Sequence, residues 1–100
     1  MLTHEGRLRV MVADDQVVAA RGAVMYLGAL DFEVVGTLDD PRRLLRTFDE
    51  MRPDVVLLEP TMGPKGAAFA HVAELVSAHP EARVLALTGD LTPVSVEAAL

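Results

Sequence analysis

Cysteine is absent from this chain of 100 residues, and lysine occurs once, at Lys65. The lack of cysteine excludes a disulfide framework and a thiolate site, and it suits a reducing, cytoplasmic environment. The formal net charge is −6, which argues against nucleic-acid binding by this segment alone, because phosphate contacts need clustered lysine and arginine. No apolar run is long enough to span a membrane, and the N-terminus lacks the apolar core of a signal peptide.

Apolar residues make up 51% of the sequence, which is enough for the core of one domain. Runs of branched apolar residues predict strands at residues 8–13, 32–37, 55–59 and 83–88. Apolar residues at helical spacing predict helices at residues 17–30, 41–52, 67–79 and 93–100. This alternation of strands and helices predicts a parallel sheet with helices on both faces.

Capping residues and apolar stripes define the predicted helices. Asp15 is placed to cap the first helix, and Asp40-Pro41 and Thr92-Pro93 put a capping side chain before a proline of the first turn. The expected buried positions are Val17, Val18, Val24, Leu27 and Leu30 in the first helix, Leu44, Leu45, Phe48 and Met51 in the second, and Ala68, Val72, Leu75 and Val76 in the third.

The stretch from Asp54 to Pro60 contains four consecutive branched apolar residues between two prolines. A run without polar alternation is typical of a strand that is covered on both faces, as in the middle of a parallel sheet. Glu59 follows it directly. In open α/β sheets, binding sites gather at the carboxyl ends of the strands, so this acid is a candidate functional residue.

Three strand ends should bring polar groups to the same edge of the sheet. Asp14-Asp15 follow the first strand, Glu59 follows the third, and Thr88-Gly89 follow the fourth. Two unit charges about 4 Å apart repel by roughly 4 kcal/mol at an effective dielectric constant near 20. The repulsion is relieved if a hard cation such as Mg²⁺ binds, or if one carboxyl group takes up a proton because its pKa is raised.

Three segments resemble the receiver domain of two-component response regulators, in its LuxR/NarL-type branch. They are Arg9 to Gln16 with the acidic pair, Arg52 to Leu58 leading to the phosphoacceptor position, and Pro80 to Thr88 with the phosphate-sensing threonine. The resemblance covers nearly all of residues 8–100, after a polar lead of residues 1–7. It implies a doubly wound, flavodoxin-like sheet with strand order 2-1-3-4-5.

The resemblance also implies a role for each matching residue. Asp14 and Asp15 would form the acidic pair on the metal side. Thr61 would offer its carbonyl to Mg²⁺ and its N–H to a phosphoryl oxygen. Thr88 and the N–H of Gly89 would bind the phosphoryl group.

The acceptor position departs from the family, because receivers accept phosphate on aspartate and this chain has Glu59. Phosphoryl transfer depends on placing the nucleophile accurately, and a misplacement of about 1 Å can cost 10²-fold in rate. The longer side chain brings the carboxylate close to where phosphoryl oxygens would lie. Glu59 therefore predicts a phosphorylation-independent receiver that partly imitates the phosphorylated state, with weak Mg²⁺ binding through Asp14, Asp15, Glu59 and Thr61. Two other readings of Glu59 stay open: a drifted, solvated residue in a receiver that has lost signalling, and residual phosphorylation of Glu59 or a neighbour.

Other family features are missing from these 100 residues. A receiver has a fifth strand preceded by a lysine, and a fifth helix, whereas Lys65 lies in the loop after strand three. Without them, strand four should form an open apolar edge that invites pairing, so we expect protein contacts or a homodimer through this edge and the fourth helix.

The resemblance implies a sensor histidine kinase as partner and DNA binding only through an output domain outside these residues. Two alternatives remain open. One is a protein-interaction module without phosphate chemistry. The other is an enzyme such as a phosphatase or flavodoxin, although Asp14-Asp15 stand where a flavin protein needs a phosphate-binding loop. The three histidines share no ligand spacing and are expected at the surface: His4, His71 and His79.

Overall fold

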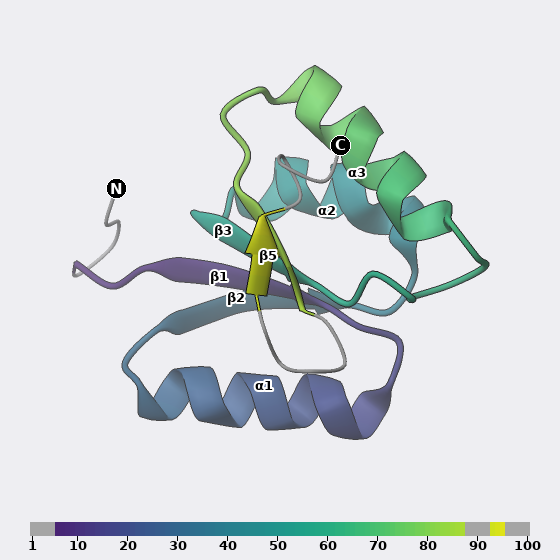
Figure 1. Ribbon diagram of the computed structural model, residues 1–100. Helices are drawn as coiled ribbons and strands as arrows, with labels where there is room; N and C mark the ends of the chain where they lie inside the picture. The colour runs from purple at the N-terminus through teal and green to yellow at the C-terminus, as the bar shows by residue number, and fades with distance from the viewer. Residues whose placement is uncertain (1–5, 88–92, 96–100) are drawn as a thin grey trace.

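The computed structural model describes residues 6–87 and 93–95, which form one sheet with helices on both faces (Figure 1). Its five strands lie in the order β2-β1-β3-β4-β5. Their bounds are β1 Arg9–Ala13, β2 Glu33–Leu38, β3 Val55–Leu58, β4 Val84–Leu87 and β5 Pro93–Ser95. β1 pairs in parallel with β2 and β3, and β3 pairs in parallel with β4. The expected flavodoxin-like sheet is therefore confirmed for its first four strands.

In the described residues, three α-helices and one short 3-10 helix connect the first four strands: α1 Val17–Ala29, η1 Pro41–Arg43, α2 Leu44–Met51 and α3 Ala67–Ala78. In Figure 1, α1 lies below the sheet, and α2 and α3 lie above it. The expected cap at Asp40 is confirmed, because its side chain accepts a hydrogen bond from the Arg42 N–H at 2.9 Å. α2 ends at Met51, before Pro53 as predicted, and Arg52 follows it with a left-handed φ of 48°.

The prediction of a helix after Thr92-Pro93 is wrong for the residues that the structure describes there. Pro93–Ser95 forms β5, which pairs antiparallel with β4 and places Leu87 opposite Pro93. The edge of β4 offers unpaired backbone groups, and a β-branched residue such as Val94 favours the extended backbone that can pair with them. Pro93 is the first residue of the strand, where its missing N–H is tolerated.

This pairing also corrects the expected open edge along strand four. β5 covers the side of β4 that faces away from β3. The remainder of the expected fourth helix, with the contacts proposed for it, lies in residues 96–100, outside the described residues. Thr88 and Gly89 lie outside them as well.

The main core lies between the sheet and the pair of helices α2 and α3. It contains alternate residues of three strands, Met11 and Ala13 of β1, Val56 and Leu58 of β3, and Val84 and Ala86 of β4, together with Leu44, Phe48, Ala68, Val72 and Leu75 of the helices. Leu45 and Val76 are partly buried and pack against this cluster. The predicted apolar stripe of α3 is therefore confirmed, and so is that of α2 apart from Met51, which is partly buried.

The predicted buried face of α1 is wrong in most of its positions. Val17, Val18 and Leu30 are 67%, 86% and 51% exposed, and α1 has no fully buried residue among those described. Val24 and Leu27 are partly buried. Because α1 is apolar on nearly every side, its sequence does not indicate which side meets the sheet.

Two further expectations fail around α1. The cap position is Gln16, not Asp15, and no side chain caps this helix. The central strand β3 is fully covered on only one face, since Val56 and Leu58 are buried while Leu57 is partly exposed. A groove of about 640 Å³ runs between α1 and the sheet, with Leu57 and Leu87 in its lining.

Candidate functional site

The carboxyl ends of β1 and β3 bring two of the predicted site residues together. Ala13 pairs with Leu58 in the parallel register, and the Glu59 N–H donates to the Ala13 carbonyl at 2.8 Å. Asp14 and Glu59 therefore emerge from neighbouring strands at the same edge of the sheet. We call Asp14, Asp15, Glu59 and Thr61, all at this edge, the acidic rim.

Asp14 is half-buried and held by the backbone around it. Its N–H donates to the Leu38 carbonyl of β2 at 3.0 Å, and its Oδ1 accepts from the Gln16 N–H at 2.9 Å. Burial raises the pKa of the Asp14 carboxyl above 3.8, the hydrogen bond from Gln16 opposes the rise, and the charges of Glu59 and Asp15 add to it. The predicted repulsion among the rim carboxylates is thus present, and it acts on Asp14.

Asp15 is exposed and joins two loops of the acidic rim. Its Oδ2 accepts a hydrogen bond from the Gly63 N–H at 3.0 Å, which links the turn after β1 to the loop after β3. Gly63 has a left-handed φ of 74°, and a Cβ at this position would lie 2.8 Å from Cγ of Pro41. Glycine is therefore required where the loop presents this N–H to Asp15.

Glu59 turns back onto the loop that follows it. Its Oε1 accepts hydrogen bonds from the Thr61 N–H at 3.1 Å and from the Thr61 hydroxyl. The loop is fixed by Met62, which is fully buried and whose N–H donates to the Glu59 carbonyl at 3.0 Å. The Glu59 carboxylate thus occupies the N–H that the family resemblance assigns to a phosphoryl oxygen.

Mg²⁺ is the cation that the resemblance implies for the acidic rim. The carboxylates supply suitable oxygen donors, but Asp15 is engaged by Gly63 and Glu59 by Thr61. Across residues 6–87 and 93–95, no three acidic or histidine side chains are grouped so that they could hold a metal ion. Two of the carboxylates that the resemblance assigns to Mg²⁺ therefore already accept hydrogen bonds from the loop after β3. Lys65 is exposed in the loop after β3.

Comparison with known proteins identifies relatives of this chain. No family model matches the chain. The response regulator GacA of Pseudomonas viridiflava is 34% identical over 82 residues, which cover 81% of this chain and 38% of that protein. The oxygen regulatory protein NreC of Staphylococcus aureus is 30% identical over 82 residues, with the same coverage of 81% and 38%.

Solved structures agree with these relatives. The signal receiver domain of a NarL response regulator from Mycobacterium tuberculosis matches with a TM-score of 0.69 and 32% identity, over 81% of this chain and 65% of that one. A LuxR-family two-component response regulator from Aurantimonas matches with a TM-score of 0.76 at 23% identity, over 82% of this chain and 59% of that one. The chain is a homologue of LuxR/NarL-type response regulators. It spans about two-fifths of the length of the curated relatives that it matches.

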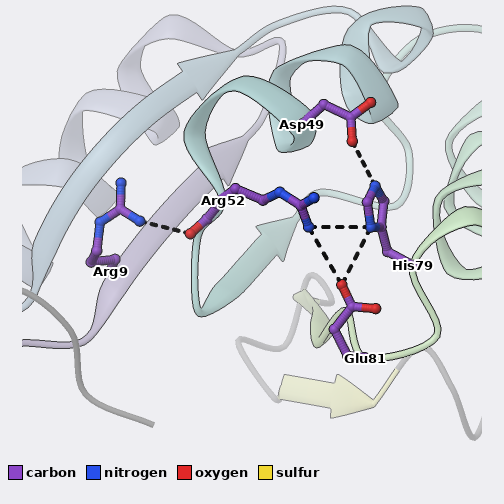
Figure 2. Close-up of polar contacts among 5 residues, drawn as sticks. All are labelled: Arg9, Asp49, Arg52, His79 and Glu81. Carbon is purple, nitrogen blue, oxygen red and sulfur yellow. Dashed lines mark hydrogen bonds and ion pairs between the residues drawn. The ribbon is translucent and has the colours of Figure 1, made fainter.

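At the opposite edge of this receiver-type sheet, sequence reasoning missed a polar cluster of Asp49, Arg52, His79 and Glu81 (Figure 2). His79 was expected at the surface, but its side chain is only 14% exposed and its ring centroid lies 4.9 Å from that of Phe48. His79 Nε2 lies 2.6 Å from Asp49 Oδ1, and its Nδ1 lies 3.3 Å from Glu81 Oε2. No sequence signal pointed to this cluster, because its members are brought together only by packing of α2 against α3.

Arg9 anchors the end of α2 beside this cluster. Its guanidinium donates to the Met51 and Arg52 carbonyls at 2.8 Å and 2.7 Å. These carbonyls lie at the C-terminus of α2, where the helix leaves acceptors without partners of its own. Arg9 thus ties the end of α2 to β1, and the polar cluster ties the end of α2 to the end of α3. Both lie at the edge of the sheet opposite the acidic rim.

Proposed function

We propose that the chain is the receiver domain of a cytoplasmic response regulator that controls transcription and acts without phosphorylation of its acceptor position. One observation carries this proposal. The Glu59 carboxylate accepts the Thr61 N–H, the donor that a phosphoryl oxygen would use in the related receivers. An unmodified side chain therefore supplies the contact that phosphate would make.

The Glu59 carboxylate imitates only part of the charge of a phosphoryl group. A carboxylate carries one negative charge, whereas a phosphoryl group carries nearly two and offers three acceptor oxygens. Glu59 engages Thr61 through a single oxygen, Oε1. We expect an intermediate activity state, between those of an unphosphorylated and a phosphorylated regulator.

The wider role rests on the relatives. GacA is named a response regulator and NreC an oxygen regulatory protein, and this chain spans 38% of the length of each. We propose that residues 8–100 form the receiver, that it has no enzymatic activity, and that DNA is bound by an output domain outside these residues. A sensor histidine kinase would be its partner only if the acceptor position retains reactivity. No helix among the described residues is long and apolar enough to cross a membrane.

Trial phosphorylation tests the acceptor position. The native chain and the Glu59→Asp variant are incubated with Mg²⁺ and acetyl phosphate, and intact mass spectrometry follows the addition of one phosphoryl group. We expect no adduct on the native chain and a slowly formed, hydroxylamine-labile adduct on Glu59→Asp, because the shorter side chain restores the usual distance. A labile adduct on the native chain contradicts the proposal.

A second variant separates imitation from loss of function. Glu59→Gln keeps the length of the side chain and its hydrogen-bond acceptor but removes the charge. We expect backbone amide NMR shifts that spread from Thr61 to β4 and β5 if the charge sets the state of the domain. Shifts confined to the loop after β3 would mean that Glu59 is a solvated residue without a signalling role.

The interaction-module alternative keeps one observation in its favour, which is the row of exposed apolar side chains on α1. The same phosphorylation trial discriminates it. A module that has lost all phosphate chemistry gains no adduct in Glu59→Asp, although failure of this variant alone would also follow from the missing lysine. Addition of a phosphoryl group to Glu59→Asp therefore excludes the alternative.

A further inference from the structure

We propose that His79 exchanges the partner of its Nδ1 atom with pH, so that Arg52 binds the neutral ring and Glu81 binds the protonated ring. Figure 2 shows a triangle of contacts at this atom. Arg52 Nη1 and Glu81 Oε2 each lie 3.3 Å from Nδ1, and they lie 3.6 Å from each other. Nδ1 cannot accept a hydrogen bond from the one and donate to the other, so no single protonation state of the ring satisfies all three contacts.

The imidazole ring is the fixed part of this triangle. The side chain of His79 is only 14% exposed, and its ring centroid lies 4.9 Å from that of Phe48. The backbone N–H of His79 donates to the Leu75 carbonyl at 2.7 Å, where α3 ends. The ring therefore keeps its place when its protonation changes, and the side chains around Nδ1 have to adjust.

Asp49 determines which nitrogen of the ring carries a proton in both states. Its Oδ1 lies 2.6 Å from His79 Nε2. An ionised carboxylate only accepts hydrogen bonds, so Nε2 carries a proton whether the ring is neutral or charged. The Nδ1 atom of the neutral ring is therefore an acceptor, and the proton that the ring gains at lower pH goes to this atom.

The neutral ring matches Arg52. A guanidinium group only donates hydrogen bonds, and the lone pair of Nδ1 accepts one from it. Arg52 also pairs with Glu81 in this state, so its guanidinium connects the ring to the turn before β4. The Glu81 carboxylate makes no hydrogen bond with a nitrogen that has no proton.

The protonated ring matches Glu81. Nδ1–H then points to a carboxylate oxygen 3.3 Å away, whereas the Arg52 guanidinium at the same distance is a second cation with only hydrogens to offer. Repulsion and the loss of the acceptor move this guanidinium away from the ring. Histidine suits such an exchange, because its charge ordinarily changes between pH 5 and 8.

Both exchanging side chains are free to move, whereas their backbones are held. The side chains of Arg52 and Glu81 are 59% and 63% exposed. The Arg52 carbonyl accepts from Arg9 at 2.7 Å. Glu81 lies in a turn that is closed by a hydrogen bond of 2.9 Å from the N–H of the buried Ala82 to the His79 carbonyl. The exchange therefore needs only rotations of two side chains.

The exchange changes the connection between α2 and the turn before β4. The charged groups that contact the ring are Asp49 of α2, Arg52 directly after α2, and Glu81 of the turn. With the ring neutral, Arg52 connects the end of α2 to Glu81. With the ring protonated, His79 itself connects Asp49 to Glu81, and the Arg52 guanidinium is released to solvent.

NMR of the histidine ring nitrogens over a pH titration tests the assigned states. Long-range proton–nitrogen correlations distinguish the two neutral tautomers from the charged ring. We expect the neutral ring of His79 to carry its proton on Nε2. A neutral ring with its proton on Nδ1 would overturn the proposal, because Nδ1 would then already donate to Glu81. A ring that stays neutral until the chain unfolds would overturn it as well.

Arg52 supplies the second readout. Its Nε–H signal, identified by its absence in Arg52→Lys, should change with the same midpoint as the His79 ring and gain the relaxation of a mobile side chain as the pH falls. The change should vanish in His79→Gln. It should remain in His71→Gln, which removes a ring that contacts Glu74 on α3. An Arg52 signal that titrates in His79→Gln, or that ignores protonation of the native ring, would contradict the exchange.

Glu81→Gln separates a hydrogen-bonded partner from a general effect of charge. It removes the carboxylate that accepts from the protonated ring, and it should lower the midpoint of the ring titration by roughly 0.3–0.7 pH unit. Glu50→Gln is the matched control. It removes the same charge beside Asp49, where Glu50 pairs with Arg46, and it should shift the midpoint by less than half as much. Equal shifts in the two variants would mean that Nδ1–H does not bind Glu81.

Discussion

Burial raises the pKa of the Asp14 carboxyl above 3.8, the Gln16 N–H works against the rise, and the charges of Glu59 and Asp15 increase it. Between the unfolded value and the raised folded value, the folded chain binds more protons than the unfolded chain. The free energy of unfolding therefore falls as the pH rises through this interval. The ionised Asp14 carboxylate therefore lowers the free energy of unfolding at neutral pH.

Asp14→Asn should raise the stability at neutral pH by less than about 1 kcal/mol, because solvent screens this partly exposed site. It should also flatten the pH dependence between the unfolded pKa and the raised folded pKa of Asp14, because the titrating group is gone while Oδ1 still accepts from Gln16. Urea denaturation followed by circular dichroism suits a chain without tryptophan. Unchanged or reduced stability at neutral pH, with the slope against pH retained, would contradict the prediction.

Asp40 affects the pH dependence of stability in the opposite direction from Asp14, because its pKa is lowered. Its side chain accepts hydrogen bonds from the side chain and backbone of Arg42, which lower its pKa from 3.8 to about 2. Its stabilising effect is present above the unfolded pKa and is lost as the pH falls through the folded one. Asp40→Asn should therefore leave a difference from the native chain that is constant near neutral pH and shrinks between pH 3.8 and about 2. Acid titration of the unfolding midpoint measures it, and a difference that persists below pH 2 would be inconsistent with this origin.

At the scale of the elements, α2 and α3 are joined by side chains that meet only in the folded chain. His79 follows α3 and contacts both Asp49 and the Phe48 ring of α2. The sequence shows none of this, because the residues are 30 positions apart and share no motif.

His79→Ala should lower the free energy of unfolding by roughly 1–2 kcal/mol at neutral pH, because it removes both the ring contact and the bond to Asp49. In a double-mutant cycle with Asp49→Ala, we expect a coupling energy of about 0.5 kcal/mol or more. Arg46→Ala is the matched control. It breaks an exposed pair with Glu50 on the same helix and should cost less than about 0.5 kcal/mol. A coupling energy near zero would show that the two side chains act independently.

The elements that sequence reasoning predicted well are those with one clear apolar face. The stripes of α2 and α3 were found because charged and small residues occupy their other sides. α1 could not be oriented, because Val18 and Met25 are as apolar as the residues that face the sheet. β5 was missed because Thr92-Pro93 also fits the start of a helix. Capping residues report only local sequence, whereas β5 forms through pairing with the edge of β4.

In the acidic rim, too, some features could be predicted from the sequence and others could not. Parallel strands bring their ends together, so the proximity of Asp14 and Glu59 followed from the sequence. The bonds from Gly63 to Asp15 and from Thr61 to Glu59 did not, because they depend on the path of the loop after β3. The roles of these residues in phosphate chemistry stay predictions until the phosphorylation trial is made.

At the scale of the whole molecule, the two faces of the sheet are covered unequally. The face toward α2 and α3 holds the cluster of buried side chains, including Leu44, Phe48 and Leu75. The other face is covered by α1 over β1 and β2, and a groove of about 640 Å³ is left beside it. Burial of apolar side chains supplies most of the stability. We therefore expect the elements on the well-covered face, α2 and α3, to be locally more stable than α1 on the other face.

Hydrogen exchange tests this distribution. Amides of α1 should open with a free energy roughly 1–3 kcal/mol below that of α3 and the central strands, because no side chain of α1 is fully buried. Leu75→Ala should cost about 2–5 kcal/mol and reduce protection throughout α2, α3 and the sheet, since Leu75 is fully buried. Val18→Ala should change protection by less than about 0.5 kcal/mol, because Val18 is 86% exposed. Exchange of α1 as slow as that of α3 would mean that the sheet and α1 open only together, and that the groove beside α1 does not weaken this face.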